Sequence, residues 1–455
     1  MQIKHFFVEK IAHSSYILAG HKTCAVIDPQ RDVDVYVNAA REMGVRITHI
    51  IQTHLHADFI SGHIDLAEKT GAAIYMAKSA NGAFEHKTLV EGDTLTIEDI
   101  KIEVLETPGH TPEHLSYVLT DLSRGESPIG VFTGDTLFVG DVGRPDLFPG
   151  KAVELASKLY DSIHEKLLKL PDFCEVYPAH GAGSLCGRAM GAKYTSTIGY
   201  ERKHNPVLQI ADKAEFIRSL TEDMPPAPDH FSRCSEVNRK GPVMLKNLPS
   251  MHPVEPQEFS ELMQSKNNVV VDTRPYLQFG GLHIPGVWHI DLDSNFPTHA
   301  GWLLPIDKDI LLVADSHEKA EEARLWAQRV GLDRVAGYLA GGMHAWLTGG
   351  YPTESVGQIS GGDLQEMLAD GEDLVVLDVR AAHELESGAI DGAVNIPTAD
   401  LRTRSGELDP ARKIVVVCGS GLRGSIGAAI LKKHGFHSVY NLAGGMMGYN
   451  AAKKK

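Results

Sequence analysis

The feature of this sequence that most constrains its fold is an internal repeat in the second half of the chain. Two successive segments, residues 251–355 and 356–455, share a Val-rich Asp-x-Arg motif in which Asp272 matches Asp378 at an offset of 106 positions. The matching stretches are 269–274 with 375–380, 281–287 with 388–394, and 339–343 with 442–446. Two copies are too few for a solenoid, and each is long enough to hold its own core, so the repeat predicts two small domains.

Each copy alternates short apolar runs with helical patterns. In the second copy, 374–377 and 414–417 are continuous apolar runs, which are typical of strands covered on both faces. A helical pattern over 425–434 follows and ends at Gly435. This alternation predicts a parallel-sheet α/β domain for each copy.

Residues 1–220 have a different pattern. Strand-like runs at 15–18 and 25–27 precede a helical stretch over 33–43, which Gly44 ends. Another strand is expected at 47–52, and Ser61 is expected to cap a helix that runs through Lys69. A proline-rich segment, 221–250, is predicted to be a linker that extends this first domain (1–250) and wraps its surface.

Composition excludes several classes of protein. The formal charge is 44 minus 59, or −15, which argues against a nucleic-acid binder. No apolar run approaches the ~20 residues that a membrane span needs. The five cysteines are scattered without a CxxC pair, so a disulfide framework is not expected and a cytoplasmic location is predicted.

A group of histidines and aspartates follows several of the expected strands. His54, His56 and Asp58 form a His-x-His-x-Asp turn directly after the strand 47–52. Three more such residues each follow another strand-like run: His110 after 102–105, Asp135 after 129–132, and His180 after 175–177. A shared cleft at the strand ends explains this placement, and imidazole with carboxylate suits zinc, iron or manganese.

These segments resemble the metallo-β-lactamase superfamily, and the resemblance covers essentially all of residues 1–220. It implies a four-layer αββα sandwich. One position departs from the family's dinuclear hydrolases, whose motif reads His-x-His-x-Asp-His, because this chain has Phe59 in place of the last histidine. Phenylalanine cannot ligate a metal, so the second metal site is expected to be empty or very weak.

The departure at Phe59 favours the mononuclear persulfide dioxygenase branch, which the segments 138–147, 182–187 and 196–202 also resemble. The resemblance implies one Fe(II) per chain, although the same ligands could hold zinc or manganese. The implied iron ligands are His54, His110 and Asp135, with His56, Asp58 and His180 orienting ligands or water rather than binding the metal.

Arg144 is the candidate to bind the carboxylate of a carrier thiol such as glutathione, because guanidinium pairs bidentately with carboxylate. The alternative for Arg144 is a structural salt bridge. Cys186 is expected to be structural, and His114 to be a neighbour of the site rather than a ligand.

A second chemical site is predicted where Cys418 follows an apolar strand and precedes a helix. Backbone N–H groups and the positive end of a helix at such a junction stabilise a thiolate or persulfide anion, and Arg423 adds a positive charge. The loop comprises Cys418, Gly419, Ser420, Gly421, Leu422 and Arg423. Both repeats resemble the rhodanese family of sulfurtransferases, and the Cys-x₄-Arg spacing favours sulfur over the phosphate that Cys-x₅-Arg phosphatases bind.

The first repeat lacks this nucleophile. Ala314 or Asp315, depending on a one-residue gap, stands at the cysteine position, and the carboxylates of Asp315 and Glu318 would repel a persulfide anion. This copy is therefore predicted to be catalytically inactive and to serve as a spacer, an interface or a docking surface.

Together these features resemble the persulfide dioxygenase–rhodanese fusions of bacterial sulfide detoxification. The resemblance implies that a thiol persulfide and O₂ give sulfite and thiol, while Cys418 passes sulfane sulfur to a thiol or to sulfite, giving thiosulfate. The alternatives are a glyoxalase II-type thioester hydrolase on the same scaffold, and a rhodanese half that acts as a non-catalytic sulfur sensor or partner-binding module. A homodimer or tetramer is expected from size and family.

Overall fold

The computed structural model describes residues 1–188, 190–222, 224 and 227–454. Positions 223, 225 and 226 of the predicted linker lie outside the described residues. The chain forms two compact units, the first made of Met1–Leu248 with Gln328–Gly331 and the second of the remaining residues from Pro249 onward. Among the described residues, no helix has the length and apolar character needed to cross a membrane.

The first unit contains two six-stranded sheets, whose strand orders are β1-β2-β3-β4-β5-β6 and β12-β11-β10-β9-β8-β7. The first sheet comprises β1 (Gln2–Val8), β2 (His13–Ala19), β3 (Thr23–Ile27), β4 (Arg46–Ile51), β5 (Ala73–Ala77) and β6 (Lys87–Leu89). The second comprises β7 (Thr94–Ile97), β8 (Ile100–Glu106), β9 (Leu115–Asp121), β10 (Gly130–Gly134), β11 (Glu175–Pro178) and β12 (Ser196–Thr197).

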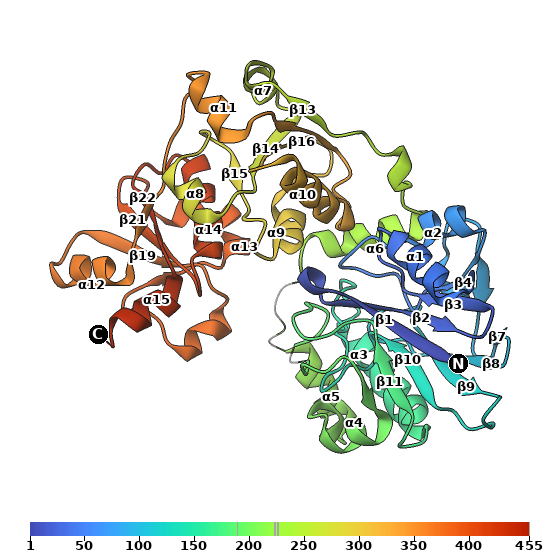
Figure 1. Ribbon diagram of the computed structural model, residues 1–455. Coiled ribbons are helices and arrows are strands. Elements are labelled where there is room, and N and C mark those ends of the chain that lie inside the picture. Colours follow the sequence, from blue (N-terminus) through green and yellow to red (C-terminus); the bar gives the residue numbers. More distant parts are fainter. Residues whose placement is uncertain (189, 223, 225–226, 455) are drawn as a thin grey trace. The chain divides into compact units, whose positions relative to one another are not determined.

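Helices cover the outer face of each sheet, and the main core lies between the sheets (Figure 1). The helices of this unit are α1 (Asp34–Met43), α2 (His63–Thr70), α3 (Ala152–Asp161), α4 (Ile198–His204), α5 (Lys213–Thr221) and α6 (His230–Lys240). Tyr16 and Ile27 of the first sheet share the inner core with Tyr117 and Phe132 of the second. Burial of this apolar area supplies the main stabilisation of the stack, and the predicted αββα sandwich is confirmed.

Two local predictions in this unit were wrong. Helix α2 begins at His63 after Gly62, and Ser61 provides no cap. The segment 221–250 is more than a wrapping linker, because it contains α6, whose Phe231 and Cys234 are buried. Phe231 packs with Phe138 in a small apolar cluster, so part of this segment belongs to the core.

The second unit holds two five-stranded parallel sheets with the same topology, β13-β17-β16-β14-β15 and β18-β22-β21-β19-β20. The first contains β13 (His252–Val254), β14 (Asn268–Asp272), β15 (Trp288–His289), β16 (Asp309–Val313) and β17 (Val335–Leu339). The second contains β18 (Gly357–Ile359), β19 (Leu374–Asp378), β20 (Val394–Asn395), β21 (Lys413–Val417) and β22 (Val439–Leu442). Identical strand order confirms the repeat and the parallel α/β fold.

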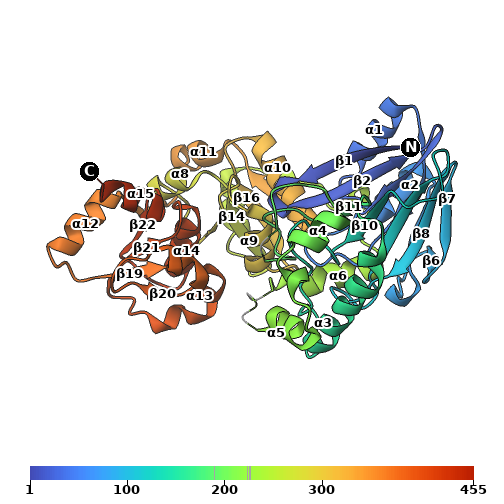
Figure 2. The ribbon, with the colours of Figure 1, turned by 90° about the horizontal axis from the view of Figure 1, so that it is seen from below.

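Helices flank both of these sheets (Figure 2). The first repeat has α7 (Pro256–Leu262), α8 (Tyr276–Gly281), α9 (Phe296–Leu303), α10 (His317–Arg329) and α11 (Gly342–Thr348). The second has α12 (Gly361–Ala369), α13 (Thr398–Arg404), α14 (Leu422–Lys433) and α15 (Gly445–Ala452). Helix α14 begins three residues before the predicted start, directly after Gly421.

The strand registers settle which residue of the first repeat replaces the cysteine. Asp272 lies opposite Val313, as Asp378 lies opposite Val417. The next residue along each central strand is therefore Ala314 in the first repeat and Cys418 in the second. A methyl group stands where the second repeat has its thiol, as one of the two predicted alignments requires.

Candidate functional site

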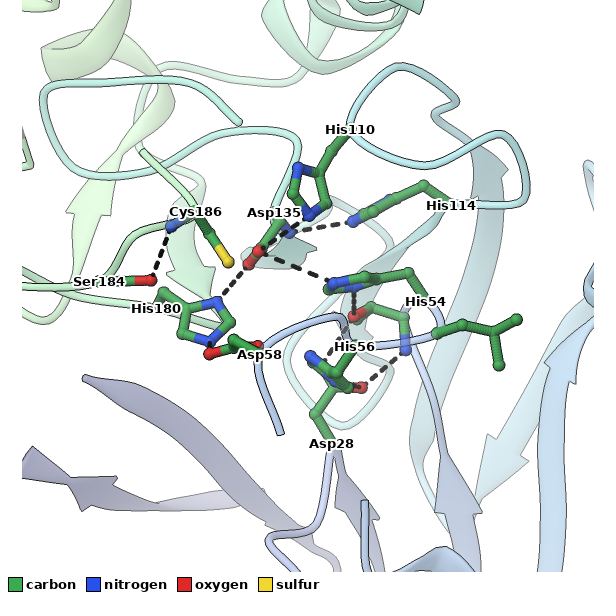
Figure 3. A network of polar contacts seen from close by, with 12 residues as sticks. Asp28, His54, His56, Asp58, His110, His114, Asp135, His180, Ser184 and Cys186 are labelled. Carbon is green, nitrogen blue, oxygen red and sulfur yellow. Dashed lines mark hydrogen bonds and ion pairs between the residues drawn. The ribbon is translucent and has the colours of Figure 1, made fainter. Parts of the chain in front are cut away.

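The histidines and aspartates predicted from the sequence meet at one end of the first unit's two sheets (Figure 3). His54 follows β4, Asp135 follows β10, and His180 follows β11. His110 lies in the loop between β8 and β9. All four side chains are buried, so the folded chain brings together residues that are up to 126 positions apart (180 − 54).

Three of these side chains point free ligand atoms at one another. His54 Nε2 lies 3.7 Å and His110 Nε2 lies 3.3 Å from Asp135 Oδ2. None of the three atoms has a hydrogen-bond partner among the described residues. Buried polar atoms without partners are costly, and a metal ion held by all three would remove that cost. The chemistry of this donor set fits a divalent transition metal such as iron(II).

The other polar atom of each candidate ligand has a partner that fixes its orientation. His54 Nδ1 lies 2.9 Å from the Thr53 hydroxyl. His110 Nδ1 donates to the backbone carbonyl of Arg144 at 2.9 Å. Burial lowers the pKa of both imidazoles, which keeps them neutral and able to ligate. Such supporting contacts are typical of metal-binding histidines.

His180 lies between two carboxylates. Its Nδ1 is 2.7 Å from Asp135 Oδ1, and its Nε2 is 2.9 Å from Asp58 Oδ2. Burial alone would lower the pKa of His180, but the two carboxylates together raise it well above its usual value. The ring therefore orients Asp135, leaving Oδ2 to face His54 and His110.

His56 and Asp58 complete a second group with His180 that could also hold a cation. His56 Nε2 lies 3.2 Å from Asp28 Oδ1, and Asp28 also accepts hydrogen bonds from the backbone and hydroxyl of Thr53. Phe59 is fully buried beside this group, with its ring centroid 4.5 Å from that of His56. An apolar ring thus stands next to the second group of potential ligands.

The Cys418 thiol lies in the loop between β21 and α14. Its side chain is buried, and the Gly421 N–H donates to Sγ at 3.1 Å. Gly421 has a φ of +97°, a conformation that glycine adopts without strain. The start of α15 supports the loop, since the N–H of Met446 donates to the Cys418 carbonyl at 2.7 Å. A backbone N–H directed at the sulfur would favour an anionic thiolate or persulfide there.

Arg423 is paired with Glu384 rather than directed at the thiol alone. Two hydrogen bonds of 2.6 and 2.7 Å join the guanidinium to the carboxylate. A hydrogen bond from Arg423 lowers the pKa of the Glu384 carboxyl, so the pair is ionised at neutral pH. The positive charge expected from the sequence is thus shared with Glu384, and the Gly421 N–H is the donor that contacts the sulfur.

Comparisons with known proteins give the family. The family model described as the metallo-beta-lactamase superfamily matches residues 9–180, and the rhodanese-like domain model matches residues 255–348 and 360–452. The mitochondrial persulfide dioxygenase ETHE1 of Homo sapiens is 30% identical over 200 residues, which are 44% of this chain and 71% of that protein. The chain belongs to the metallo-β-lactamase superfamily. It is a fusion of one such domain with two rhodanese domains.

Two other relatives bear on its classification. A metallo-beta-lactamase from Staphylococcus aureus subsp. aureus COL, known as a solved structure, is 34% identical with a TM-score of 0.67. The match covers 74% of this chain and 98% of that one. A hydroxyacylglutathione hydrolase of Rhodospirillum rubrum is 36% identical over 159 residues, which are 34% of this chain and 57% of that enzyme.

In the metallo-β-lactamase domain, Arg144 occupies a different environment from the one expected of a substrate-binding residue. The side chain is buried, and its guanidinium makes two hydrogen bonds of 2.7 Å to Asp146. It also donates to the Leu185 carbonyl at 3.1 Å. This is the geometry of the structural salt bridge, the alternative for Arg144, and a substrate carboxylate would have to displace Asp146.

His114 and Cys186 also lie beside the metal-binding group. His114 Nε2 accepts the Asp135 N–H at 2.9 Å, so this nitrogen supports the ligand's backbone. Cys186 Sγ lies within 4.8 Å of potential ligand atoms of Asp135 and His180 (Figure 3). Burial, and then the nearby Asp58 and Asp135, raise the pKa of the Cys186 thiol well above its usual value, so it is neutral.

One supporting residue could not be predicted from the sequence. Asn238 of α6 is buried, and its side-chain amide donates to the carbonyls of His56 and Phe59 at 2.9 and 2.8 Å. Its Oδ1 accepts the Ser61 N–H at 2.9 Å. Asn238 thus holds the backbone of the His-x-His-x-Asp turn from a segment 180 residues away (238 − 58), and no motif marks it.

Proposed function

We propose that the metallo-β-lactamase domain is a persulfide dioxygenase that oxidises a low-molecular-weight thiol persulfide with O₂. The observation that carries the proposal is the group of three ligand atoms without partners, His54 Nε2, His110 Nε2 and Asp135 Oδ2. Phe59 stands where the dinuclear hydrolases have a further histidine, and its ring packs against His56 of the second group. The similarity to persulfide dioxygenase ETHE1 supports the substrate class.

These three side chains would hold one iron(II) per chain. Two histidines and one carboxylate leave about three coordination positions open, and the metal would supply them to O₂ and the persulfide sulfur. The chain's own residues orient that group: Thr53 and the Arg144 carbonyl fix the two imidazoles, and His180 fixes Asp135. Burial of every one of these side chains keeps bulk water from the reacting sulfur.

The overall reaction balances with one water: RSSH + O₂ + H₂O gives RSH and sulfurous acid, which ionises to sulfite. The terminal sulfur is oxidised and O₂ is reduced. The carrier thiol RSH is released unchanged, so glutathione, coenzyme A or bacillithiol would each serve chemically.

We further propose that the second rhodanese domain transfers sulfane sulfur through Cys418. The thiolate attacks the outer sulfur of the donor, a Cys418 persulfide forms, and the donor's remaining part leaves with the electron pair. The Gly421 N–H that contacts Sγ supports this proposal. A thiol or sulfite then accepts the sulfur, and with sulfite the product is thiosulfate. Such a protein would act in sulfide detoxification, as a cytoplasmic dimer or tetramer.

A thioester hydrolase is the second candidate, favoured by the similarity to hydroxyacylglutathione hydrolase and by the group His56, Asp58 and His180. That chemistry in this family uses two metal ions. Both ring nitrogens of His180 already face carboxylates, and Phe59 adds no ligand. Metal analysis separates the candidates, since the dioxygenase is expected to bind one iron and the hydrolase two metal ions per chain.

The test uses three variants of the full chain. His110→Ala should lose iron and oxygen uptake, whereas His204→Ala, which changes an exposed histidine, should retain both. Cys418→Ser should lose sulfur transfer and keep oxygen uptake. Persulfide-dependent oxygen uptake by His110→Ala, or sulfur transfer by Cys418→Ser, would refute the corresponding assignment.

A further inference from the structure

Helix α14, which begins at the Cys418 loop, packs against the cysteine-less repeat. It contacts α8 and β15 of that repeat, and both repeats belong to the same compact unit (Figure 1). A buried hydrogen bond of 2.9 Å joins Ser425 Oγ of α14 to His289 Nδ1 of β15. The inactive copy is therefore held directly against the helix that starts at the reactive loop.

Tyr276, the first residue of α8, reaches the loop itself. The Gly444 N–H donates to Tyr276 Oη at 3.4 Å. A side-chain carbon at Gly421 would lie only 3.1 Å from Tyr276 Cζ, so the phenol ring packs against Gly421. Gly421 is the residue whose N–H contacts Cys418 Sγ. The tyrosine thus touches the backbone that surrounds the thiol.

The position of Tyr276 is fixed from its own repeat. Its backbone N–H donates to Asp291 Oδ2 at 2.8 Å. In the second repeat the offset of 106 places Ala382 at the equivalent position (276 + 106), so the active copy has no phenol of its own there. Tyr276 is half-buried, which leaves part of its side chain accessible beside the loop.

We propose that Tyr276 is a substrate-positioning residue of the sulfur-transfer site, supplied by the repeat that lacks the cysteine, and that it favours small sulfur oxyanions. The Tyr276 oxygen accepts the Gly444 N–H, so its own O–H proton remains available to an anionic oxygen of thiosulfate or sulfite. The ring limits the room over Gly421 for a larger donor. This inference rests on the proposed sulfur transfer through Cys418.

The transfer that Tyr276 would assist needs no oxidant. The Cys418 thiolate attacks the sulfane sulfur of thiosulfate, an S–S bond to Cys418 forms, the S–SO₃ bond breaks, and sulfite leaves with the electron pair. In the reverse direction sulfite accepts the sulfur. In both directions the oxygens of thiosulfate or sulfite carry negative charge, which a hydrogen bond from the phenol O–H would stabilise.

The experiment compares thiosulfate with glutathione persulfide as sulfur donors for the full-length protein and its variants. Tyr276→Phe keeps the ring and removes the hydroxyl, and it should raise KM for thiosulfate about tenfold with little change in kcat, the loss of one hydrogen bond to a charged group. KM for glutathione persulfide should change much less. Tyr276→Ala should shift selectivity further toward the larger donor. Tyr338→Phe, whose ring lies against His317 in the same repeat, is the matched control.

The outcomes separate the two levels of the proposal. Sulfur transfer that survives in Cys418→Ser would overturn the proposed function of the rhodanese domain. If Cys418→Ser is inactive but Tyr276→Phe has the wild-type ratio of kcat/KM for the two donors, the role of Tyr276 is refuted. An equal loss with both donors in Tyr276→Phe would also refute it, because a merely structural contact would not discriminate between donors.

Discussion

At the scale of single residues, the sequence predicts which side chains could ligate a metal or react better than it predicts the residues that contact them. His54, His110 and Asp135 could be predicted because each follows a strand, and strand ends converge in a layered fold. Arg144 shows the limit of such reasoning. Its pairing with Asp146, two positions away, depends on the local backbone, and a sequence motif does not encode that conformation.

The side-chain amide of Asn238 supports the His-x-His-x-Asp turn, and its removal can be tested. Replacing it with alanine leaves the carbonyls of His56 and Phe59 without their amide donors, at about 1–3 kcal/mol for each buried group left unpaired. Asn238→Ala should therefore unfold at a lower temperature and bind iron more weakly, because the metal-binding turn loosens. Calorimetry and an iron titration would measure both, with the exposed Asn247→Ala as control. Wild-type iron affinity in Asn238→Ala would contradict this role.

At the scale of elements, the two rhodanese domains share a paired-glycine turn before their last helix. Paired glycines with positive φ begin α11 and α15, at Gly341–Gly342 and at Gly444–Gly445. The repeat could be predicted from sequence because these glycines and the Asp-x-Arg motif recur. The identity of the residue in place of the cysteine could not, because a one-residue gap left two alignments until the strand register selected Ala314.

Gly445 tests how closely α15 must approach the loop. A side-chain carbon there would lie 2.3 Å from the Cys418 carbonyl oxygen, so Gly445→Ala should displace the loop and abolish sulfur transfer while oxygen uptake persists. Gly435→Ala introduces a residue at a comparable positive φ of +85° with no atom within 4 Å. That control should lose only about 1–2 kcal/mol of stability, because alanine disfavours a positive φ, and should keep its activity. Equal activity of the two variants would contradict the close-contact explanation.

The contact between β15 and α14 predicts a pH dependence. Burial lowers the pKa of His289 to about 4, so the folded state leaves it neutral where the unfolded chain takes up a proton. Between pH 6.5 and about 4 the second unit should therefore lose stability as the pH falls. His289→Asn should reduce that slope by up to about 1.4 kcal/mol per pH unit.

Tryptophan fluorescence during urea unfolding measures this directly, because all four tryptophans, Trp288, Trp302, Trp326 and Trp346, belong to the second unit. Wild-type and His289→Asn curves would be compared at pH 7 and pH 5. An identical loss of stability in both proteins would show that His289 is not the titrating group.

At the scale of the whole molecule, the proposed functions give the chain two sites that would handle the same class of sulfur compound by different chemistry. The metal-binding group lies in the first unit and Cys418 in the second. A substitution at either proposed site should therefore leave the residues of the other untouched. The order of the domains was predictable from the motifs, whereas the role proposed for the cysteine-less repeat was not, because it depends on contacts between segments that no motif links.

Oxygen uptake by the iron-loaded protein given glutathione persulfide, with sulfite assayed in the same vessel, tests the proposed dioxygenase most directly. A persulfide dioxygenase should take up oxygen and form one sulfite per O₂ consumed. An absence of uptake by protein shown to contain iron, with the persulfides of several carrier thiols, would contradict the dioxygenase assignment and favour the hydrolase.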